Sequence, residues 1–299
     1  MPPLVSVCTP TFNRRPFIPS MFQCFLSQDY PKDCMEWIIV DDGTDPIEDL
    51  VRASGIPQIK YVRLTEKLPL GKKRNLMHSH TKGEILVYMD DDDYYPPQRV
   101  SHAVERLTNS PALCAGSSIL FIYYKLLHQI YKFGPYGANH ATAGTFAFKR
   151  ELLKDSAYDD AAALAEEKSF LKNYTVPFVQ LDPMKVILVF AHPHNTFDKH
   201  KLLGPKVKTV RELTNLNVKD FISDKQLYHF YTRDMYRALY EYPEGDTCMK
   251  PDVLAQMSKT QLPSIRFGDK ILTGDEIVAH LNHQQDFIKR LTDRLRANS

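Results

Sequence analysis

Gly83-Glu84-Ile85-Leu86-Val87-Tyr88-Met89-Asp90-Asp91-Asp92-Asp93 is the stretch that decides the fold, because five apolar residues lead directly into four aspartates. A short apolar run of this kind is typical of a buried strand. Four adjacent carboxylates repel one another, so a counter-charge is expected at the end of that strand. Mg²⁺ or Mn²⁺ would supply it, bound by one or two carboxylates together with phosphate oxygens and water. The alternative is a solvated acidic turn before the next helix.

Strands and helices are predicted to alternate on both sides of this stretch. Short apolar runs indicate strands, and apolar residues spaced i, i+3, i+4, i+7 indicate helices. Such alternation implies right-handed crossovers and a mostly parallel sheet. The sequence therefore predicts an α/β fold with a Rossmann-like central sheet flanked by helices. The expected order is strand 4–9, helix 18–25, strand 37–40, helix 47–53, strand 59–64, helix 72–80, strand 85–89 and a helix through 100–107.

Polar residues follow three of the predicted strands at the point where each strand ends. They are Thr9-Pro10-Thr11-Phe12-Asn13, Asp41-Asp42-Gly43 and the aspartates from Asp90 to Asp93. In open α/β sheets, ligands bind beyond the carboxyl ends of the strands. We therefore expect the three loops to converge on one rim and to form the functional site there.

The remainder of the chain is less regular. Strands are expected at 119–127, 145–148 and 186–190, with a helix at 164–174. Beyond about residue 205 the segments 218–240 and 275–296 read as charged helices, with no strong strand after Phe190. The sequence therefore predicts a domain over 1–204 that carries the site and a helical region over 205–299. That region could pack on the first domain, form a homodimer or shape an acceptor site.

Composition narrows the classes of protein that the chain can belong to. It has 299 residues, 43% hydrophobic and 25% charged, enough for one large domain or two ordinary ones. Its 38 basic and 36 acidic residues leave a net charge of +2, which argues against a nucleic-acid binder. No apolar run approaches the ~20 residues of a membrane span and no signal peptide is recognisable, so a cytoplasmic protein is expected. The five scattered cysteines indicate reduced thiols.

Three blocks of the first 200 residues resemble the family 2 glycosyltransferases, which have the GT-A fold. The first block is Val5-Ser6-Val7-Cys8-Thr9-Pro10-Thr11-Phe12-Asn13, and the second is Ile38-Ile39-Val40-Asp41-Asp42-Gly43. The third contains Gly71-Lys72-Lys73-Arg74-Asn75, then Gly83-Glu84-Ile85, then the four aspartates with Pro97 and Arg99. Their order and spacing make the resemblance specific. It implies transfer of a sugar from a nucleotide-sugar donor, most often with inversion at the anomeric carbon.

The resemblance also implies roles for individual residues at the nucleotide-sugar site. Phe12, beside Pro10, would stack on the base, and Asp42 would accept a hydrogen bond from it. Arg74 would lie near the diphosphate. Asp90 and Asp92 would be the two ends of the DxD motif, with Asp92 contacting Mn²⁺ or Mg²⁺ directly and Asp91 near the ribose or the metal. Gly144 would border the donor and acceptor positions.

An inverting transfer needs a general base to take the proton of the acceptor hydroxyl. By resemblance this base lies at the start of a helix about 75 residues after the DxD motif, where the chain has Ala165-Glu166-Glu167-Lys168. Glu167 aligns best and Glu166 is the alternative, since the family commonly shows Glu-Asp here. Further on, His192 and His194 follow a strand, and either could contact the phosphate or the metal.

Three functions compete for this sequence. The leading one is a metal-dependent inverting glycosyltransferase that moves a sugar, with a UDP-sugar favoured and GDP or dTDP donors as alternatives, to a glycan or other hydroxyl acceptor. A second is a sugar nucleotidylyltransferase, which normally has a glycine-rich loop after the first strand. The loop of this chain, residues 10–15, has no glycine. A third is an inactive relative that binds nucleotide or glycan as a scaffold.

Overall fold

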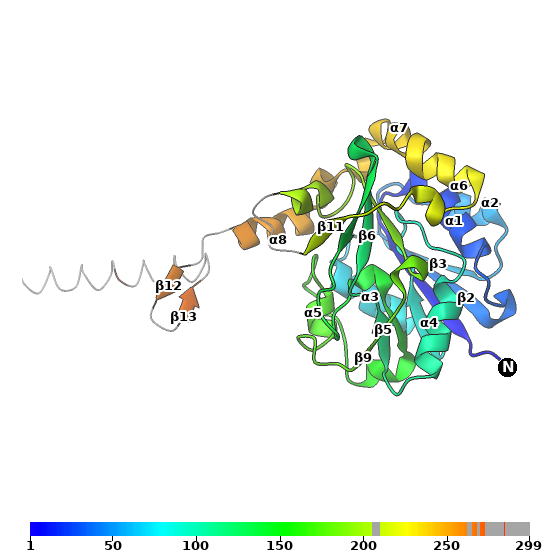
Figure 1. The fold of residues 1–299 in the computed structure, drawn as a ribbon, viewed down its shortest axis with the longest axis horizontal. Coiled ribbons are helices and arrows are strands. Elements are labelled where there is room, and N and C mark those ends of the chain that lie inside the picture. The colour runs from blue at the N-terminus through cyan, green and yellow to red at the C-terminus, as the bar shows by residue number, and fades with distance from the viewer. Residues whose placement is uncertain (205–209, 262–264, 268–269, 273–283, 285–299) are drawn as a thin grey trace, which may run out of the picture. The chain divides into compact units, whose positions relative to one another are not determined.

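Seven strands form the central sheet, in the order β3-β2-β1-β4-β8-β5-β9 (Figure 1). β1, β2, β3 and β4 run parallel, β8 is antiparallel to β4 and β5, and β5 pairs parallel with β9. The mostly parallel sheet predicted from the sequence is confirmed. The strands are β1 (Val5–Thr11), β2 (Met35–Asp41), β3 (Ile59–Arg63), β4 (Ile85–Tyr88), β5 (Cys114–Gly116), β8 (Ala147–Lys149) and β9 (Phe178–Gln180).

This computed structural model describes residues 1–204, 210–261, 265–267, 270–272 and 284. It contains two compact units, Met1–Lys250 and Pro251–Ser299. The second unit contains α8 (Pro251–Gln261), β12 (Ile265–Phe267) and β13 (Lys270–Leu272). The helix predicted for 275–296 lies outside the described residues, apart from position 284.

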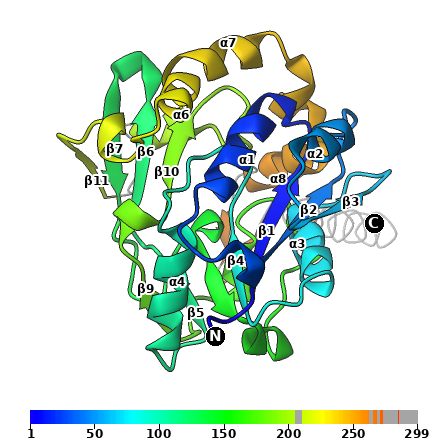
Figure 2. The ribbon, with the colours of Figure 1, turned by 90° about the vertical axis from the view of Figure 1, so that its right-hand side faces the viewer.

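Helices cover both faces of the central sheet because the side chains of each strand alternate between two hydrophobic clusters (Figure 2). On β4, Ile85 and Val87 pack in one cluster with α1 and α4, while Leu86 and Tyr88 pack in the other with α3 and α5. The helices α1, α4, α3 and α5 therefore bury apolar side chains against the sheet. The helices are α1 (Ile18–Leu26), α2 (Glu48–Ser54), α3 (Leu70–Ser79), α4 (Arg99–Thr108) and α5 (Glu167–Phe170).

A second sheet of four strands, in the order β10-β6-β7-β11, begins next to the aspartates. A β-bridge between Tyr94 and Leu188 joins it to the chain just after Asp93. Two helices, α6 (Lys225–His229) and α7 (Met235–Tyr240), are joined by a π-helical turn at Phe230–Asp234. The strands of this sheet are β6 (Leu120–Tyr124), β7 (Gln129–Phe133), β10 (Leu188–Ala191) and β11 (Arg211–Leu213).

Two predicted segments differ from the structure. The helix expected at 164–174 is reduced to the four residues of α5, because Ala165 and the three residues 172–174 have positive φ, a conformation that ends a right-handed helix. The region expected to be helical after residue 205 also contains strands. β11 is an exposed three-residue edge strand held by backbone pairing to β7, so no apolar pattern marks it.

The division into units also falls at a different place from the predicted boundary at residue 204. The first unit continues to Lys250. It does so because Leu227, Tyr231, Met235 and Leu239 join the same hydrophobic cluster as α1 and the second sheet. The segment 210–250 is therefore part of the structure that surrounds the aspartates.

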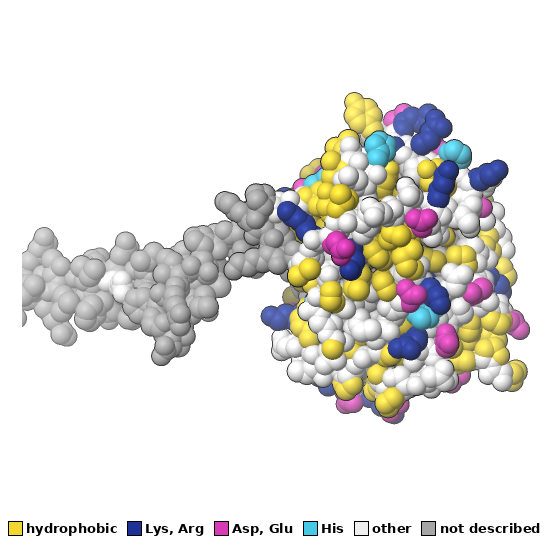
Figure 3. All heavy atoms as spheres, in the orientation of Figure 1, with side chains coloured by type: hydrophobic (Ala, Val, Ile, Leu, Met, Phe, Trp, Pro, Cys, Tyr) yellow, Lys and Arg dark blue, Asp and Glu magenta, His cyan; other side chains and the backbone are white. Residues whose placement is uncertain are grey.

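The surface and the cysteines add three observations. On the face shown in Figure 3, basic and acidic side chains are interspersed among hydrophobic ones. Among the described residues, no helix has the length and apolar character needed to cross a membrane. All five cysteines are free thiols, as predicted, and three of them are buried.

Candidate active site

The three predicted loops meet at the carboxyl ends of β1, β2 and β4. Thr11 pairs with Asp41 in the last register position of β1 and β2, and the Met89 amide donates to the Cys8 carbonyl across β1 and β4. Asn13, in the loop after β1, has a positive φ and donates its side-chain amide to Thr44 at 3.0 Å. The convergence follows from parallel strands ending at one edge.

The four aspartates face different partners. Asp90 lies 3.5 Å from the guanidinium of Arg74, while Asp93 accepts the Phe190 amide at 3.1 Å and so ties the aspartate loop to the second sheet. Asp91 and Asp92 share the Arg14 guanidinium, each with a carboxylate oxygen 3.5 Å from one of its nitrogens. The repulsion expected from the sequence is thus offset by two buried arginines.

Burial and mutual repulsion give the aspartates of this cluster different pKa values. Loss of solvation raises the pKa of Asp90, and it raises that of Asp91 to about 7 against the opposing effect of Arg14. Burial also raises the pKa of Asp93 well above its ordinary value. Burial acts on Asp92 as well, but the positive charges of Arg14 and Lys199 oppose it, and Asp92 alone in the cluster has a lowered pKa. Asp92 is therefore the aspartate that stays ionised most readily.

Arg14 was not among the predicted site residues. It is buried, and besides the two carboxylates it donates to the carbonyls of His194 at 2.7 Å and Gly245 at 3.0 Å. In the sequence it is one of two adjacent arginines after β1. The second, Arg15, pairs with Asp45 and Asp49 at the surface. Nothing in the sequence distinguishes the two.

His192 lies beside Asp92, with Nε2 3.3 Å from Oδ2. The His192 backbone amide donates to Oδ1 of Asn195 at 2.9 Å, which orients that amide so that its Nδ2 donates to His192 Nε2 at 2.8 Å. Nε2 is therefore an acceptor without a proton. Burial, which lowers the pKa of His192 to about 4, agrees with a neutral ring. The contact with Asp92 is thus between two acceptors.

His194 is also buried, but its contacts are of another kind. Its carbonyl accepts from Arg14, and its ring lies against Gly245, where an added Cβ would be 2.6 Å from Nδ1. Burial lowers the pKa of His194 too. The structure places the ring of His192 at the carboxylates and the backbone of His194 at Arg14.

Arg74 connects the aspartates to the glutamate pair. Its Nε donates to Glu166 at 2.9 Å, and its guanidinium lies over the Tyr88 ring at 4.4 Å. Glu166 is buried in this ion pair, whereas Glu167 is half-buried. Desolvation, and then the neighbouring Glu166 charge, raise the pKa of Glu167 to about 7. A carboxylate with that pKa is suited to accepting a proton near neutral pH.

Gly144 lies directly against the aspartates. A Cβ at this position would be 2.8 Å from Asp90 Oδ2, so a side chain there would collide with the carboxylate. The Tyr95 hydroxyl bonds both the Asp90 amide, at 2.7 Å, and the Gly144 carbonyl, at 3.3 Å. The absence of a side chain at Gly144 therefore leaves room for the Asp90 carboxylate.

The predicted base-binding residues lie at the ends of β1 and β2. Phe12 follows Pro10 and Thr11 and is 9% exposed, with the Lys67 ammonium 5.1 Å from its ring centroid. Asp42 is already engaged, because one oxygen pairs with the Lys73 ammonium and the other accepts the Leu68 amide at 2.8 Å. A nucleobase at Asp42 would therefore share that carboxylate with Lys73.

Arg74, which is expected near the diphosphate, lies on α3, and the groups at the start of this helix already have partners within the protein. The helix begins at Leu70, and the amide of Gly71 already donates to the Ala162 carbonyl at 2.9 Å. Lys73 and Arg74, the two buried cations of this helix, are committed to Asp42 and to the Asp90–Glu166 pair. The positive charges of α3 are therefore paired with carboxylates of the protein itself.

A divalent cation fits the Asp92–His192 edge. Two unprotonated acceptors held 3.3 Å apart are stabilised by a positive charge between them, and one carboxylate oxygen with one imidazole nitrogen suits Mn²⁺. Asp90 has a buried oxygen, Oδ1, that accepts no hydrogen bond, although the Arg74 guanidinium lies 3.5 Å from it. Among the described residues, no group of three or more His, Cys, Asp or Glu side chains forms a metal site. Phosphate oxygens and water would complete the shell.

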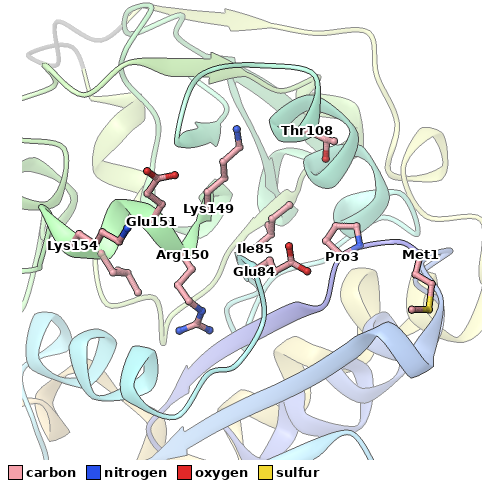
Figure 4. Close-up of a pocket in the computed structure, with 10 residues that line it drawn as sticks. Met1, Pro3, Glu84, Ile85, Thr108, Lys149, Arg150, Glu151 and Lys154 are labelled. Atoms are coloured by element: carbon pink, nitrogen blue, oxygen red, sulfur yellow. The ribbon is translucent and has the colours of Figure 1, made fainter.

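A surface hollow of about 970 Å³ lies elsewhere (Figure 4). Its walls include Pro3 before β1, Glu84 before β4 and Lys149 at the end of the antiparallel β8. These positions belong to the amino ends of the parallel strands. The aspartates follow the carboxyl ends, so the hollow is separate from the candidate site.

Comparison with known proteins agrees with this geometry. The model of the family described as "Glycosyl transferase family 2" matches residues 6–156, which contain the three loops and Gly144. The chain belongs to glycosyl transferase family 2. The predicted resemblance is confirmed, and so is the GT-A fold class.

Curated relatives match parts of this family 2 chain. It is 34% identical over 102 residues to the putative colanic acid biosynthesis glycosyl transferase WcaA of Escherichia coli (strain K12), covering 33% of this chain and 36% of WcaA. It is 31% identical over 130 residues to the putative teichuronic acid biosynthesis glycosyltransferase TuaG of Bacillus subtilis (strain 168), covering 42% and 49%. The matches thus span half or less of those relatives.

Solved structures share the fold of this family 2 chain. The mannosyltransferase PcManGT from Pyrobaculum calidifontis, in complex with GDP-Man and Mn²⁺, has a TM-score of 0.52 at 21% identity, covering 63% of this chain and 57% of its own. Staphylococcus aureus TarS 1-349, in complex with UDP, has a TM-score of 0.51 at 16% identity, covering 90% and 96%. At these identities the likeness concerns the fold.

Proposed function

We propose that this protein is a metal-dependent inverting glycosyltransferase that moves a sugar from a nucleotide-sugar, with a UDP-sugar favoured, to the hydroxyl of a glycan or similar acceptor. One observation carries the proposal. A single buried arginine, Arg74, joins Asp90 of the aspartate cluster to Glu166, next to Glu167 with its raised pKa. Donor-binding carboxylates and a candidate base are thus held in a fixed relation.

The aspartate end of this arrangement suits the leaving diphosphate. Asp92 and His192, with Asp90 nearby in the sequence as the other end of the DxD motif, would bind Mn²⁺ or Mg²⁺ together with phosphate oxygens; such an ion would neutralise charge on the departing phosphate. Asp93 fixes the loop through the Phe190 amide, and Gly144 leaves the space next to Asp90 open. Phe12 lies at the same rim and would contact the nucleobase there, next to the Lys67 ammonium.

The glutamate end suits proton transfer. Glu166 is spent on Arg74, so its carboxylate is a positioning group that holds Arg74 against Asp90 and raises the pKa of its neighbour. Glu167 accepts the proton of the acceptor hydroxyl as the oxygen attacks the anomeric carbon on the face opposite the diphosphate. Inversion follows from that single displacement.

The identity of the nucleobase in the donor is also part of the proposal. Among proteins with the same fold, TarS was solved with UDP and PcManGT with GDP-Man, so the fold admits both bases. The phenylalanine at position 12, with Asp42 beside it, favours uracil by resemblance to the family's pocket.

A thermal-unfolding screen tests the proposal. UDP, GDP, dTDP and CMP, together with their common sugar conjugates, are each added with Mn²⁺ or with EDTA. A ligand that binds only the folded protein raises the midpoint according to its affinity. A midpoint rise with one nucleotide family that requires Mn²⁺ supports the proposal, whereas no rise with any nucleotide refutes it.

A further inference from the structure

The segment Tyr242–Lys250, here called the strap, follows α7 and lies across the loops of the candidate site. The Asn13 side-chain amide donates to the Glu244 carbonyl at 2.7 Å, and Arg14 donates to the Gly245 carbonyl at 3.0 Å. The Thr247 hydroxyl donates to the Asn195 carbonyl at 3.1 Å. The strap therefore bridges the loop after β1 and the loop after β10, the two loops that hold Arg14 and His192.

The contact is close enough to require glycine at its centre. A Cβ on Gly245 would lie 2.6 Å from Nδ1 of His194 and 2.8 Å from the carbonyl oxygen of Asn13. Real Cβ atoms essentially never approach so closely, so a side chain would push the strap away from both loops. The geometry of the strap is thus specific to these two loops.

The strap ends in a buried cation. Lys250 is 5% exposed, and its ammonium makes one hydrogen bond, to the Thr196 hydroxyl at 2.8 Å. It takes part in no ion pair with any other residue that the structure describes. An ammonium has three donors and a buried charge needs a partner, so two donors and the charge are left for a ligand.

The surroundings of Lys250 show which ligand this is. The charged groups that act on it are Arg14, Asp92, Asp91 and Lys67, which are groups of the candidate site and its rim. Burial and the repulsion from Arg14 lower its pKa to about 7, against the attraction of the two aspartates. A metal ion held at Asp92 would bring phosphate oxygens to the same aspartates, and Lys250 is then placed to contact a phosphate group.

We propose that Lys250 binds the diphosphate of the nucleotide donor, so that the strap supplies a phosphate-binding residue from outside the part of the chain that the family model matches. The inference rests on the proposed function, since it assigns a further residue to the same donor. It commits to the diphosphate, because the charges of Asp91, Asp92 and Arg14 all act on Lys250. Lys250 then strengthens binding of a nucleoside diphosphate more than of a monophosphate.

The competing interpretation is that Lys250 only fastens the strap to Thr196. A fastening role affects every nucleotide to the same extent, because it acts through the fold. A phosphate-binding role affects the diphosphate alone. The ratio of two affinities therefore separates the two roles.

The experiment measures UDP and UMP affinities by titration calorimetry in saturating Mn²⁺, for the full chain and for Lys250→Met. Methionine keeps the length of the side chain and is well tolerated in buried positions. A hydrogen bond to a charged group is worth enough that UDP affinity should fall about 10- to 100-fold, with UMP affinity within about twofold. Equal losses for both nucleotides, or no loss for either, overturn the inference.

Three controls keep the outcomes distinct. Lys250→Arg retains the cation and should keep most of the preference for UDP over UMP. Loss of that preference in Lys250→Arg would also contradict the inference. Lys225→Met removes an exposed lysine at the start of α6 and should leave both affinities unchanged. If Lys250→Met does not fold, Lys250→Gln replaces it. If the unmodified protein binds UDP normally but the preference survives in Lys250→Met, the inference alone fails; if it binds no nucleotide, the proposed function fails as well.

Discussion

Replacement of Glu167 by glutamine gives the sharpest test of the catalytic assignment. The pKa of Glu167 is raised to about 7 by burial and by Glu166, so this group is protonated below that pH and charged above it. A general base must be charged to act. With a pKa of about 7, about one tenth of Glu167 is ionised at pH 6 and about nine tenths at pH 8. We therefore expect kcat/KM to rise about tenfold between these two pH values.

Glu167→Gln should lose most of the transfer and all of this pH dependence. A positioned base contributes about 10²- to 10⁴-fold, so kcat should fall by that factor while the affinity for the nucleotide-sugar stays within about twofold. The assay follows release of nucleoside diphosphate from pH 5.5 to 8.5, after the donor screen has identified the substrate.

The control for this prediction is Glu166→Gln. That variant removes the partner of Arg74 and one cause of the raised pKa, so it should lower stability and shift the pH profile to lower values while transfer persists. The assignment would be refuted if Glu167→Gln were active while Glu166→Gln were inactive and of normal stability. The base would then be Glu166.

The remaining predictions concern binding and stability. Asp92→Ala should abolish the Mn²⁺-dependent part of the nucleotide-induced rise in the unfolding midpoint, while Asp33→Ala, an exposed aspartate, should not; an unchanged rise would remove Asp92 from the metal site. Gly245→Ala should cost about 1–3 kcal/mol in urea unfolding, because its Cβ would meet His194, and a neutral effect would contradict the close fit of the strap. Trp37→Ala should cost about 3–5 kcal/mol, since this side chain is fully buried and stacked on a phenylalanine of α1; a cost below about 1 kcal/mol would contradict that packing.

Local sequence patterns were sufficient to predict the central sheet and the polar residues at its rim. The strands before Thr11, Asp42 and Asp90 could be predicted because each is a short apolar run that a helix pattern follows. The parallel arrangement then requires their polar ends to meet. The helix at 164–174 could not be predicted in its true length, because the positive φ values of Ala165 and of residues 172–174 come from the turn around the glutamates and leave no signature in residue type.

Long-range contacts decided the other parts of the site. Arg14 and Arg15 are adjacent and identical in type, yet one is buried between two aspartates and the other pairs with acids at the surface. Glu166 and Glu167 differ in the same way, through an arginine more than 90 residues away in sequence. The contact between the strap and Arg14 joins residues that are even farther apart in sequence, since Gly245 and Arg14 are separated by 231 positions.

The sequence by itself determined that this chain forms a parallel α/β sheet with an acidic rim, because periodicity and strand-end composition are local properties. The tertiary structure alone decided which charges are buried, which glutamate is held in an ion pair by Arg74, and that residues up to Lys250 pack against the loops of the candidate site. Those properties depend on burial and on distances between residues far apart in the chain. Coulomb energies and desolvation are set by that geometry and not by order along the sequence.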